Sequence, residues 1–441
     1  MAIQSTRLKK NQQIQMGSQT ATVVDKLGEG GQGTVYKVRI DSTNEEKALK
    51  WYFAEKIKDP QMFYNNLKAN IASGTPSSAF IWPEMLTEWV NGTFGYIMRI
   101  FPKDYKSFSK FLLAQTSFDS YSAMVNAALN IVQAFKDLHY KGYNYQDLND
   151  GNFSINPVTG DVLICDNDNV MGHGQSSGVV GKARYMAPEV VRGEKTPDKQ
   201  TDRFSLAVVL FLLLIGDHPL EGQKTNVPCL TNTHDKKFFG TEPVFMYDEQ
   251  DNTNRPVPKK QVNAEMFWPC FPAFIQDAFK QSFSKDSLIQ SKGRLLDDGW
   301  LHLLVRLKSS IIKCPHCGSE MFIEHIGKTD CSDCKKSVSA IGYLKFAKKR
   351  SNIEIIVPIY EGIVLYDYHM KESSDDYKTV AANVVVKPGK FGLENKSKNR
   401  WVVTAADSNT NTKQSGETAL LAAGSKIDFG NGNIAEIISN N

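Results

Sequence analysis

A glycine-rich stretch near the N-terminus constrains the fold of this chain more than any other segment. It reads Leu27-Gly28-Glu29-Gly30-Gly31-Gln32-Gly33-Thr34-Val35. This G-x-G-x-x-G-x-V pattern lets the backbone lie close to the phosphates of a nucleotide. Alone, it would equally fit a dinucleotide-binding turn or a flexible hairpin. A Walker loop is excluded, because it needs a lysine after Gly33, where Thr34 stands.

Four further features follow the glycine loop in a fixed order. Lys50 lies seventeen residues after Gly33, in a run that predicts a strand of the same sheet. Tyr145 to Asn152 has the spacing of H-R-D-L-x-x-x-N, Asp166-Asn167-Asp168 stands where D-F-G is expected, and Ala187 to Glu189 is A-P-E. Such elements in order are far more specific than any one alone. Over roughly residues 20–308 the chain resembles a bacterial-type serine/threonine protein kinase.

The resemblance implies an enzyme that uses ATP and Mg²⁺ to phosphorylate a protein substrate, and it gives roles to single residues. Asp147 would accept the proton of the substrate hydroxyl and Lys50 would hold the α- and β-phosphates, with Asn149 as a third residue of the catalytic group. The expected magnesium ligands are Asn152, Asp166 and Asp168, where a slip of one residue would exchange the two aspartates. The expected nucleotide contacts are Leu27, Gly28, Gly30, Gly33, Val35, Ala48, Lys50, Met98, Arg99 and Phe101.

Several residues depart from the family pattern. Tyr145 and Gln146 replace the histidine and arginine of the catalytic loop, and Asn149 replaces the lysine that faces the transferring phosphate. Asn167 is polar where an apolar residue is usual, and the segment over 57–71 has no glutamate to pair with the strand lysine. A catalytically weak pseudokinase that binds nucleotide and assembles partners is therefore the alternative. Four retained residues favour the active enzyme: Lys50, Asp147, Asn152 and Asp166.

The usual phosphorylation switch of the activation segment is also missing. Gln146 stands where an arginine would receive the phosphate, and Lys182 occupies the usual phosphothreonine position. We therefore predict that basal activity does not depend on phosphorylation of Ser176 or Ser177. The alternative is that Lys182 or Arg184 receives a phosphate on one of these serines.

Four of the seven cysteines form two C-x-x-C pairs that predict a metal site: Cys314, Cys317, Cys331 and Cys334. Each pair can lie on a tight turn that directs two thiolates at one ion. Four thiolates complete a tetrahedral structural zinc site with no open position, so we expect this zinc to stabilise a ribbon rather than to catalyse.

The order of these patterns predicts an α+β chain: a bilobal kinase fold, a small Cys₄ zinc ribbon and a C-terminal all-β domain. The expected ranges are a polar tail over 1–19, an N-lobe over 20–101, a C-lobe over 102–310 with an insertion at about 221–263, a ribbon over 311–345 and a β domain over 351–441. Two stretches of the last domain, 389–393 and 427–430, faintly resemble a forkhead-associated β-sandwich.

The catalytic loop and the ribbon together resemble the kinase of the bacterial tellurite-resistance-associated phosphorylation triad. This resemblance implies a von Willebrand A-type protein and a PP2C-type phosphatase as partners. The net charge of only +4 gives no strong general attraction to nucleic acid or to membranes. The longest apolar run, over 206–215, is too short to span a bilayer. We therefore expect a cytoplasmic protein.

Overall fold

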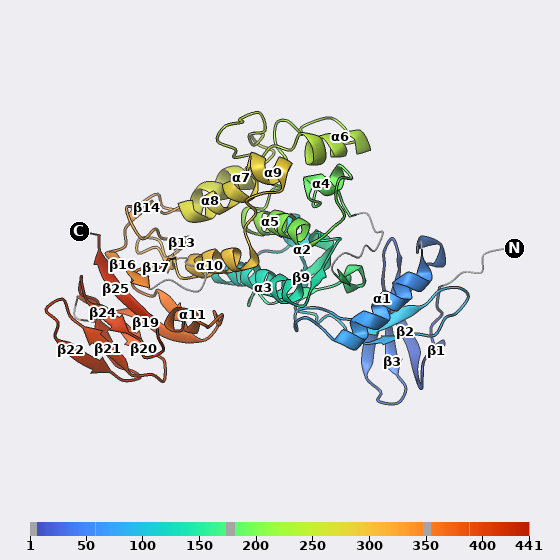
Figure 1. Cartoon of the computed structure of the whole chain (residues 1–441), viewed down its shortest axis with the longest axis horizontal. Coiled ribbons are helices and arrows are strands. Elements are labelled where there is room, and N and C mark those ends of the chain that lie inside the picture. The colour runs from blue at the N-terminus through green and yellow to red at the C-terminus, as the bar shows by residue number, and fades with distance from the viewer. Residues whose placement is uncertain (1–6, 58, 173–180, 347–353, 388, 441) are drawn as a thin grey trace.

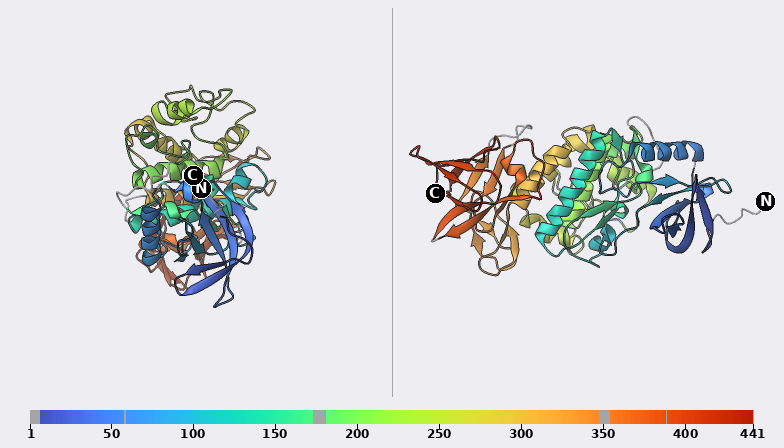
Figure 2. Two further views of the ribbon diagram at one scale, coloured as in Figure 1. Left: turned by 90° about the vertical axis from the view of Figure 1, so that its right-hand side faces the viewer. Right: turned by 90° about the horizontal axis from the view of Figure 1, so that it is seen from below.

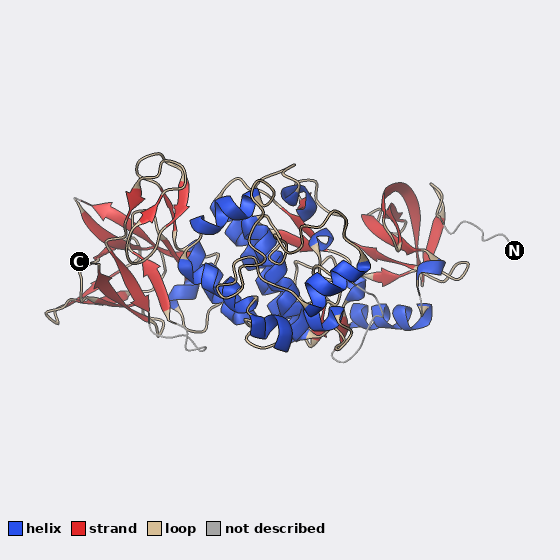
Figure 3. Cartoon of the chain, turned by 90° about the horizontal axis from the view of Figure 1, so that it is seen from above, coloured by secondary structure: helices blue, strands red, loops and turns tan. Residues whose placement is uncertain are grey.

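The computed structural model describes residues 7–57, 59–172, 181–346, 354–387 and 389–440. The molecule is elongated, with a β-rich lobe at the N-terminal end, a helical lobe in the middle and a β-sandwich at the C-terminal end (Figure 1). Colouring by secondary structure separates these parts clearly (Figure 3). Among the described residues, no helix combines the length and apolar composition that a bilayer crossing requires.

The N-terminal lobe is a six-stranded antiparallel sheet in the order β1-β2-β3-β4-β6-β5. Its strands are β1 (Gln13–Met16), β2 (Gln19–Glu29), β3 (Gly33–Ile40), β4 (Glu46–Tyr52), β5 (Met85–Leu86) and β6 (Gly95–Met98). The register sets Val35 opposite Lys50 and Ala48 opposite Met98. β1 lies within the range predicted as a polar tail, and it joins the sheet because alternate side chains, including Ile14, are buried against it.

Helix α1 (Pro60–Ser73) packs beside this sheet, next to the one-turn helix η1 (Ala54–Lys56). It begins where Asp59 accepts a hydrogen bond from the Met62 amide and Pro60 fills the first helical position. Its buried face presents Phe63 and Leu67 to the cluster around β4 and β6. The helix is therefore held by packing and an N-terminal cap.

The C-terminal lobe surrounds one buried helix, α5 (Lys199–Ile215). Its segment Leu206 to Ile215 is apolar on every side, which is the pattern of a helix enclosed by others. The surrounding helices are α2 (Phe108–Leu112), α3 (Tyr121–Tyr140), α4 (Pro188–Val191), α6 (Asn232–Lys236), α7 (Val262–Phe267), α8 (Ala273–Ser282), α9 (Lys285–Gln290) and α10 (Asp297–Lys308). Short helices η2 (Asp150–Asn152), η3 (Asn167–Asn169), η4 (Lys237–Thr241) and η5 (Trp268–Cys270) connect them.

Short strands between these helices carry the loops of the interlobe region. They are β7 (Lys106–Ser107), β8 (Tyr143–Asn144), β9 (Phe153–Ile155), β10 (Val162–Ile164) and β11 (Met171–Gly172). β9 pairs with both β10 and β7, and β8 pairs with β11. The catalytic loop lies between β8 and β9, and the D-F-G position lies between β10 and β11.

The segment predicted as an insertion has little regular structure apart from α6, η4 and the start of α7. It is nevertheless anchored, because the fully buried Asn254 side chain donates hydrogen bonds to the carbonyls of Leu220 and Val244. Phe245 and Met246 from the same segment are also buried. The segment therefore contributes to the core of the lobe.

Two buried carboxylates anchor functional segments to the C-terminal lobe. Arg294 makes a bidentate ion pair with Glu189 of the A-P-E element, with both N–O distances at 2.8 Å. Asp202 on α5 accepts the backbone amide of Tyr145 at 2.7 Å and also contacts His139. These contacts fix the catalytic loop and the A-P-E element to the core of the lobe.

The ribbon consists of two short hairpins: β12 (Ile311–Lys313) with β13 (Glu320–Phe322), and β14 (Thr329–Asp330) with β15 (Ser337–Val338). It packs on the start of α3, where the rings of Tyr121 and Phe322 stack at 5.0 Å between centroids. The Tyr121 amide also donates to Glu320 at 2.5 Å. The ribbon is thus attached to the helix that leads into the catalytic loop.

Within its described residues, the C-terminal part is all β, as predicted, apart from the short helix α11 (Asp367–Met370). Its two sheets have the orders β17-β16-β25-β24-β21-β22 and β18-β19-β20-β23. The strands are β16 (Gly342–Phe346), β17 (Ile355–Pro358), β18 (Val364–Tyr366), β19 (Val380–Lys387), β20 (Lys390–Asn395), β21 (Trp401–Thr404), β22 (Thr410–Lys413), β23 (Thr418–Leu420), β24 (Lys426–Asp428) and β25 (Ile434–Ser439). All of β16 except its last residue falls within the range predicted for the ribbon, but the strand pairs with β25 of the sandwich.

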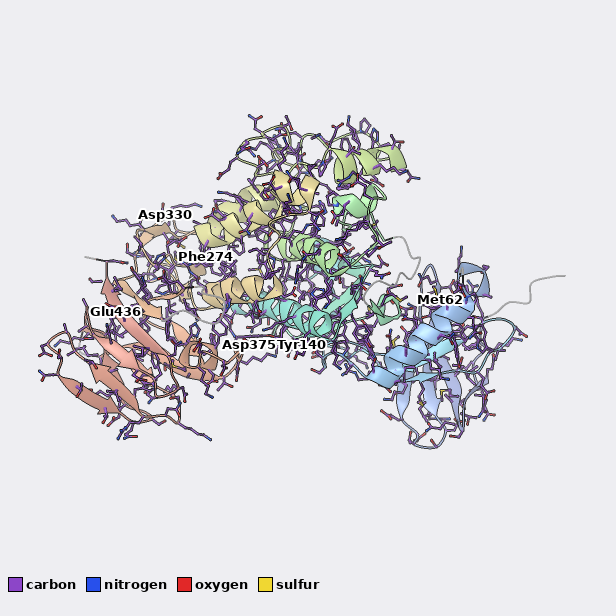
Figure 4. The ribbon with its side chains drawn as sticks, in the orientation of Figure 1. Met62, Tyr140, Phe274, Asp330, Asp375 and Glu436 are labelled. Atoms are coloured by element: carbon purple, nitrogen blue, oxygen red, sulfur yellow. The ribbon has the colours of Figure 1, made fainter. Side chains whose placement is uncertain are left out.

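The sandwich contacts the catalytic lobe through the loop after α11. Lys136 on α3 forms an ion pair with Asp375 at 2.7 Å, and the Tyr377 hydroxyl donates to Asn130 at 3.0 Å. Asp375 lies at this junction in the side-chain view (Figure 4). The right-hand view of Figure 2 shows the sandwich on the far side of the helical lobe from the N-terminal lobe.

Candidate active site

The glycine loop contains two kinds of glycine. A Cβ at Gly33 would lie 2.2 Å from the carbonyl oxygen of Trp51, so packing of β3 on β4 requires glycine there. A Cβ at Gly28 or Gly30 would meet nothing within 4 Å. These two positions therefore border open space, where the backbone can approach a ligand.

An apolar cluster joins the two lobes behind this loop. It contains Ala48 and Met98 from the sheet together with Leu163 from β10, and Val35 and Phe101 pack against it. The structure thus brings together four predicted nucleotide contacts and adds Leu163. Sequence reasoning did not include Leu163 among the nucleotide contacts, because only the fold brings it next to the other lobe.

The remaining predicted nucleotide contacts are more peripheral. Leu27 is half exposed, at the edge of the glycine loop. The guanidinium of Arg99 donates to the carbonyls of Ser78 and Phe80, at 2.9 and 3.0 Å. The Arg99 side chain is therefore engaged with the segment before β5, so a nucleotide contact at this residue would come from its backbone.

Lys50 is the charged centre of the site. Its Nζ lies 2.7 Å from Asp168 Oδ2 and 3.0 Å from Asp166 Oδ1, and the Tyr52 hydroxyl also donates to Asp168 Oδ2. Burial alone would lower the pKa of Lys50, but the charges of Asp166 and Asp168 outweigh it and hold the pKa well above its ordinary value. The side chain of Asp168 is fully buried, whereas that of Asp166 is 46% exposed. Asp168 therefore occupies the role of the missing helix glutamate as the buried partner of Lys50.

Helix α1 is attached to the site in a different way. The side-chain amides of Asn66 and Asn70 both donate to the carbonyl of Val170, each at 3.1 Å. Val170 directly follows η3, which contains Asn167 and Asp168 of the D-F-G position. The helix is thus tied to the backbone beside the two aspartates by neutral hydrogen bonds.

The catalytic loop holds Asp147 next to the predicted metal ligands. The Asn149 side chain donates to Asp147 Oδ1 at 3.3 Å. The backbone amide of Asn149 donates to Asn152 Oδ1 at 2.7 Å. The backbone of Asn152 accepts the amide of Cys165, the residue before Asp166, at 2.8 Å. Burial raises the pKa of the Asp147 carboxyl to about 6, although the Asn149 hydrogen bond opposes it.

Two departures from the family pattern have clear structural partners. Tyr145 is fully buried, and its hydroxyl donates to the carbonyl of Cys165. The Asn167 side chain is also fully buried and donates to the carbonyls of Ile81 and Ile164, at 2.8 and 3.0 Å. Each side chain donates a hydrogen bond to the backbone of the interlobe region, so neither leaves its donor unsatisfied.

Lys182 reaches the catalytic loop from the segment before A-P-E. Its Nζ lies 3.1 Å from Asn149 Oδ1 and 3.2 Å from Asp150 Oδ1. Ser176 and Ser177, the two predicted alternative phosphorylation sites, lie outside the described residues. Sequence reasoning noted Lys182 as the residue that replaces a threonine and as an alternative receiver of a phosphate on Ser176 or Ser177, but it did not find the contact with the catalytic loop.

The four paired cysteines converge on one point of the ribbon. Their Sγ atoms all lie within 4.8 Å of one another, with Cys314 to Cys334 at 3.7 Å and Cys317 to Cys331 at 3.6 Å. Four thiolates at about 2.3 Å from one ion in a tetrahedron would be about 3.8 Å apart. The donor set and its spacing therefore fit zinc.

Comparison with known proteins supports the same reading of the fold. A protein kinase domain model matches residues 21–279. The serine/threonine-protein kinase AtPK2/AtPK19 of Arabidopsis thaliana is 26% identical over 226 residues, 48% of this chain and 45% of that protein. The protein kinase YegI of Escherichia coli is 25% identical over 224 residues, 48% of this chain and 32% of that protein.

A further relative matches over fewer residues but with a higher sequence identity. The probable serine/threonine-protein kinase PknB of Bifidobacterium longum is 35% identical over 101 residues, 21% of this chain and 14% of that protein. The chain spans less than half the length of these curated relatives. The kinase model nevertheless covers more than half of the chain, and its range includes the glycine loop, Lys50, the catalytic loop and both aspartates. The chain therefore belongs to the protein kinase family.

Proposed function

We propose that this chain is a protein serine/threonine kinase that transfers the γ-phosphate of ATP to a protein hydroxyl. One observation carries the proposal. The hydrogen-bonded chain from Asp147 through Asn149 and Asn152 leads to the backbone beside Asp166, which is paired with Lys50. A base, a cation and two oxygen ligands are thus gathered at the junction of the two lobes, as phosphoryl transfer requires.

Each of these residues has a role in the proposed reaction. Gly28 and Gly30 let backbone amides approach the phosphates, and Lys50 neutralises the phosphate next to the leaving group. Asp147 orients the attacking hydroxyl and accepts its proton. Mg²⁺ held by Asn152 and Asp166 would offset the charge of the transferring group.

Asp168 has a second role in this proposal. The sequence predicts it as a further magnesium ligand, and its contacts with Lys50 and Tyr52 favour a structural task as well. Its Oδ2 accepts both of these donors, while Oδ1 has no hydrogen bond within the described residues. We therefore assign the exposed Asp166 as the main carboxylate ligand and Asp168 as the residue that positions Lys50.

The names of the relatives support serine and threonine as acceptors, because AtPK2/AtPK19 and PknB are both called serine/threonine kinases. The rival proposal is a pseudokinase scaffold that binds nucleotide without transferring phosphate. The replacement of the catalytic-loop lysine by Asn149 favours that rival, whereas the four retained residues favour the enzyme.

The remaining parts of the chain are assigned by chemistry and by resemblance. The cysteine cluster supports a structural zinc ion in the ribbon. The resemblance to the tellurite-associated kinase supports a von Willebrand A-type protein and a PP2C-type phosphatase as partners, and a cytoplasmic location. The sandwich supports a role in protein contacts, and its faint likeness to forkhead-associated domains makes a phosphopeptide the first ligand to try.

Transfer of labelled γ-phosphate separates the enzyme from the scaffold. The wild type and Asp147→Asn are compared for ATP binding and for phosphate incorporated into a mixed protein substrate with Mg²⁺. Lys280→Met, on α8, serves as a control of an ion-paired lysine far from the site. We expect the wild type and Asp147→Asn both to bind ATP. Only Asp147→Asn should lose phosphate transfer. ATP binding without transfer in the wild type would establish the scaffold instead.

A further inference from the structure

The proposed reaction needs a cation on the acceptor side of the site. Charge develops on the transferring phosphoryl group, and fixed positive charge beside it lowers the barrier. Lys50 is committed to the opposite side, where Asp166 and Asp168 hold it at 3.0 and 2.7 Å. The catalytic loop itself offers only the neutral Asn149 two residues after Asp147. The acceptor side must therefore draw its cation from another segment.

Lys182 lies at that place. Its Nζ is 3.1 Å from Asn149 Oδ1, and the amide nitrogen of the same Asn149 side chain is 3.3 Å from Asp147 Oδ1. The ammonium group is thus separated from the catalytic carboxylate by a single side chain. The preceding residue also packs there, since a Cβ on Gly181 would lie 3.1 Å from Asp147 Oδ1.

The environment of Lys182 suits a contact with a phosphate. Its side chain is 56% exposed, and its other partner, Asp150, is 20% exposed. An ion pair of this kind contributes little to stability, so Lys182 can exchange Asp150 for a more strongly charged anion. A lysine is a compact charge on a flexible stem, so a small rotation can move Nζ from Asn149 toward a bound phosphate.

We propose that Lys182, from the segment before A-P-E, contacts the γ-phosphoryl group in place of a catalytic-loop lysine. This inference rests on the proposed kinase function. The substrate oxygen forms the new bond to phosphorus while the bond from phosphorus to the β-phosphate oxygen breaks, and ADP leaves with that electron pair. The hydroxyl proton passes to Asp147. Lys182 stays protonated throughout and offsets the charge on the phosphoryl oxygens.

The alternative is a purely structural role, in which Lys182 only anchors its segment to the catalytic loop through Asp150. Three variants separate the two roles. Lys182→Met removes the charge and keeps the length of the side chain, and Asp150→Asn weakens the anchor but keeps the cation. The exchange variant Asn149→Lys/Lys182→Asn moves the lysine into the catalytic loop. Lys280→Met again serves as the control.

Turnover with γ-labelled ATP is measured for each variant, with kcat and KM for ATP determined separately. We expect Lys182→Met to lower kcat by about 10²-fold, the usual effect of losing one electrostatic contact to a transition state, with KM for ATP changed less than about threefold. Asp150→Asn should keep kcat within about threefold of the wild type. The exchange variant should have a kcat at least tenfold higher than that of Lys182→Met.

Two results would overturn the assignment of Lys182. One is a Lys182→Met enzyme with wild-type kcat, while Asp147→Asn is inactive; the proposed function would then stand without this residue. The other is an equal loss in Lys182→Met and Asp150→Asn with no recovery in the exchange variant, which would make Lys182 an anchor. A wild type that binds ATP but transfers no phosphate would remove the proposed function and this role together.

Discussion

At the scale of single residues, the site compensates for its missing family residues with new side-chain partners. Asp168 takes over the pairing of Lys50, across 118 positions of sequence. In kinases that use a helix glutamate, movement of the helix can break the ion pair with the strand lysine. Here the partner belongs to the D-F-G position itself, so the charge of Lys50 is held independently of α1.

The substitution Asp168→Asn tests this pairing. It leaves the buried Lys50 ammonium with only the exposed Asp166, and breaking a buried ion pair commonly costs about 3 to 5 kcal/mol. We expect a clearly lower thermal midpoint together with at least a tenfold loss of kcat/KM for ATP. Asp277→Asn, on the exposed face of α8, is the matched control. A variant with the stability and kinetics of the wild type would show that Asp168 does not hold Lys50.

The pH dependence of turnover tests the role of Asp147. Burial raises its pKa to about 6, with the charges of Asp166 and Asp168 acting in the same direction and Asn149 and Lys182 opposing them. Only the ionised carboxylate accepts a proton, so kcat/KM should fall as the pH drops through about 6. Asn149→Leu removes a hydrogen bond that lowers this pKa, so its acidic limb should move to higher pH. A limb that moves to lower pH would contradict the assignment.

At the scale of helices and strands, one buried histidine joins three helices of the C-terminal lobe. His139 at the end of α3 contacts Asp202 on α5 at 3.2 Å and Asp297 on α10 at 2.9 Å. Burial by itself would lower the pKa of His139. The hydrogen bonds and charges of the two carboxylates outweigh it and raise the pKa to about 9. The protonated imidazole therefore stabilises the arrangement that also holds the Tyr145 amide.

This contact predicts a pH-dependent stability. The folded pKa of about 9 exceeds the unfolded value of about 6.5, so the stabilisation is complete below about pH 6.5 and is lost as the pH rises through about 9. Its upper size is roughly 3 kcal/mol, at about 1.4 kcal/mol for each pKa unit. The difference in unfolding free energy between the wild type and His139→Asn should shrink over this range. A difference that stays constant or grows with pH would refute the ion pair.

The elements also show how far sequence reasoning reaches. Motif residues that are close in sequence, such as Asp147 and Asn152, could be placed in one loop because their spacing fixes it. Contacts between distant segments could not be predicted, because they depend on how the lobes fold. The contact of Asp168 with Lys50 and that of Lys182 with Asn149 are examples. β1 was missed as well, because four residues with two buried side chains give too weak a pattern against a polar background.

At the scale of the whole molecule, the ribbon lies between the catalytic lobe and the sandwich. It contacts α3 through Tyr121, and it is continuous with β16, the strand that opens the sandwich sheet. The sandwich itself contacts α3 further along, through Lys136 and Asp375. α3 ends just before the catalytic loop, so both C-terminal parts contact the same element of the kinase.

Loss of zinc should therefore loosen this junction. We expect about one zinc ion per chain in the purified protein. The Cys314→Ser variant should lose most of it and unfold the ribbon at a lower temperature, since zinc coordination contributes directly to folding. His316→Ala is the control, because His316 lies between Cys314 and Cys317 in the sequence but is not part of the cysteine cluster. A fully folded wild type without metal would contradict the zinc assignment.

The central claim is that the residues gathered around Asp147 transfer phosphate to serine or threonine. The most direct measurement uses a peptide library with serine, threonine or tyrosine acceptors, γ-labelled ATP and Mg²⁺, followed by identification of the phosphorylated amino acid. We predict label on serine or threonine with the wild type and a loss of at least 10²-fold with Asp147→Asn. Equal labelling by the wild type and Asp147→Asn, or no labelling by a wild type that binds ATP, would contradict the account.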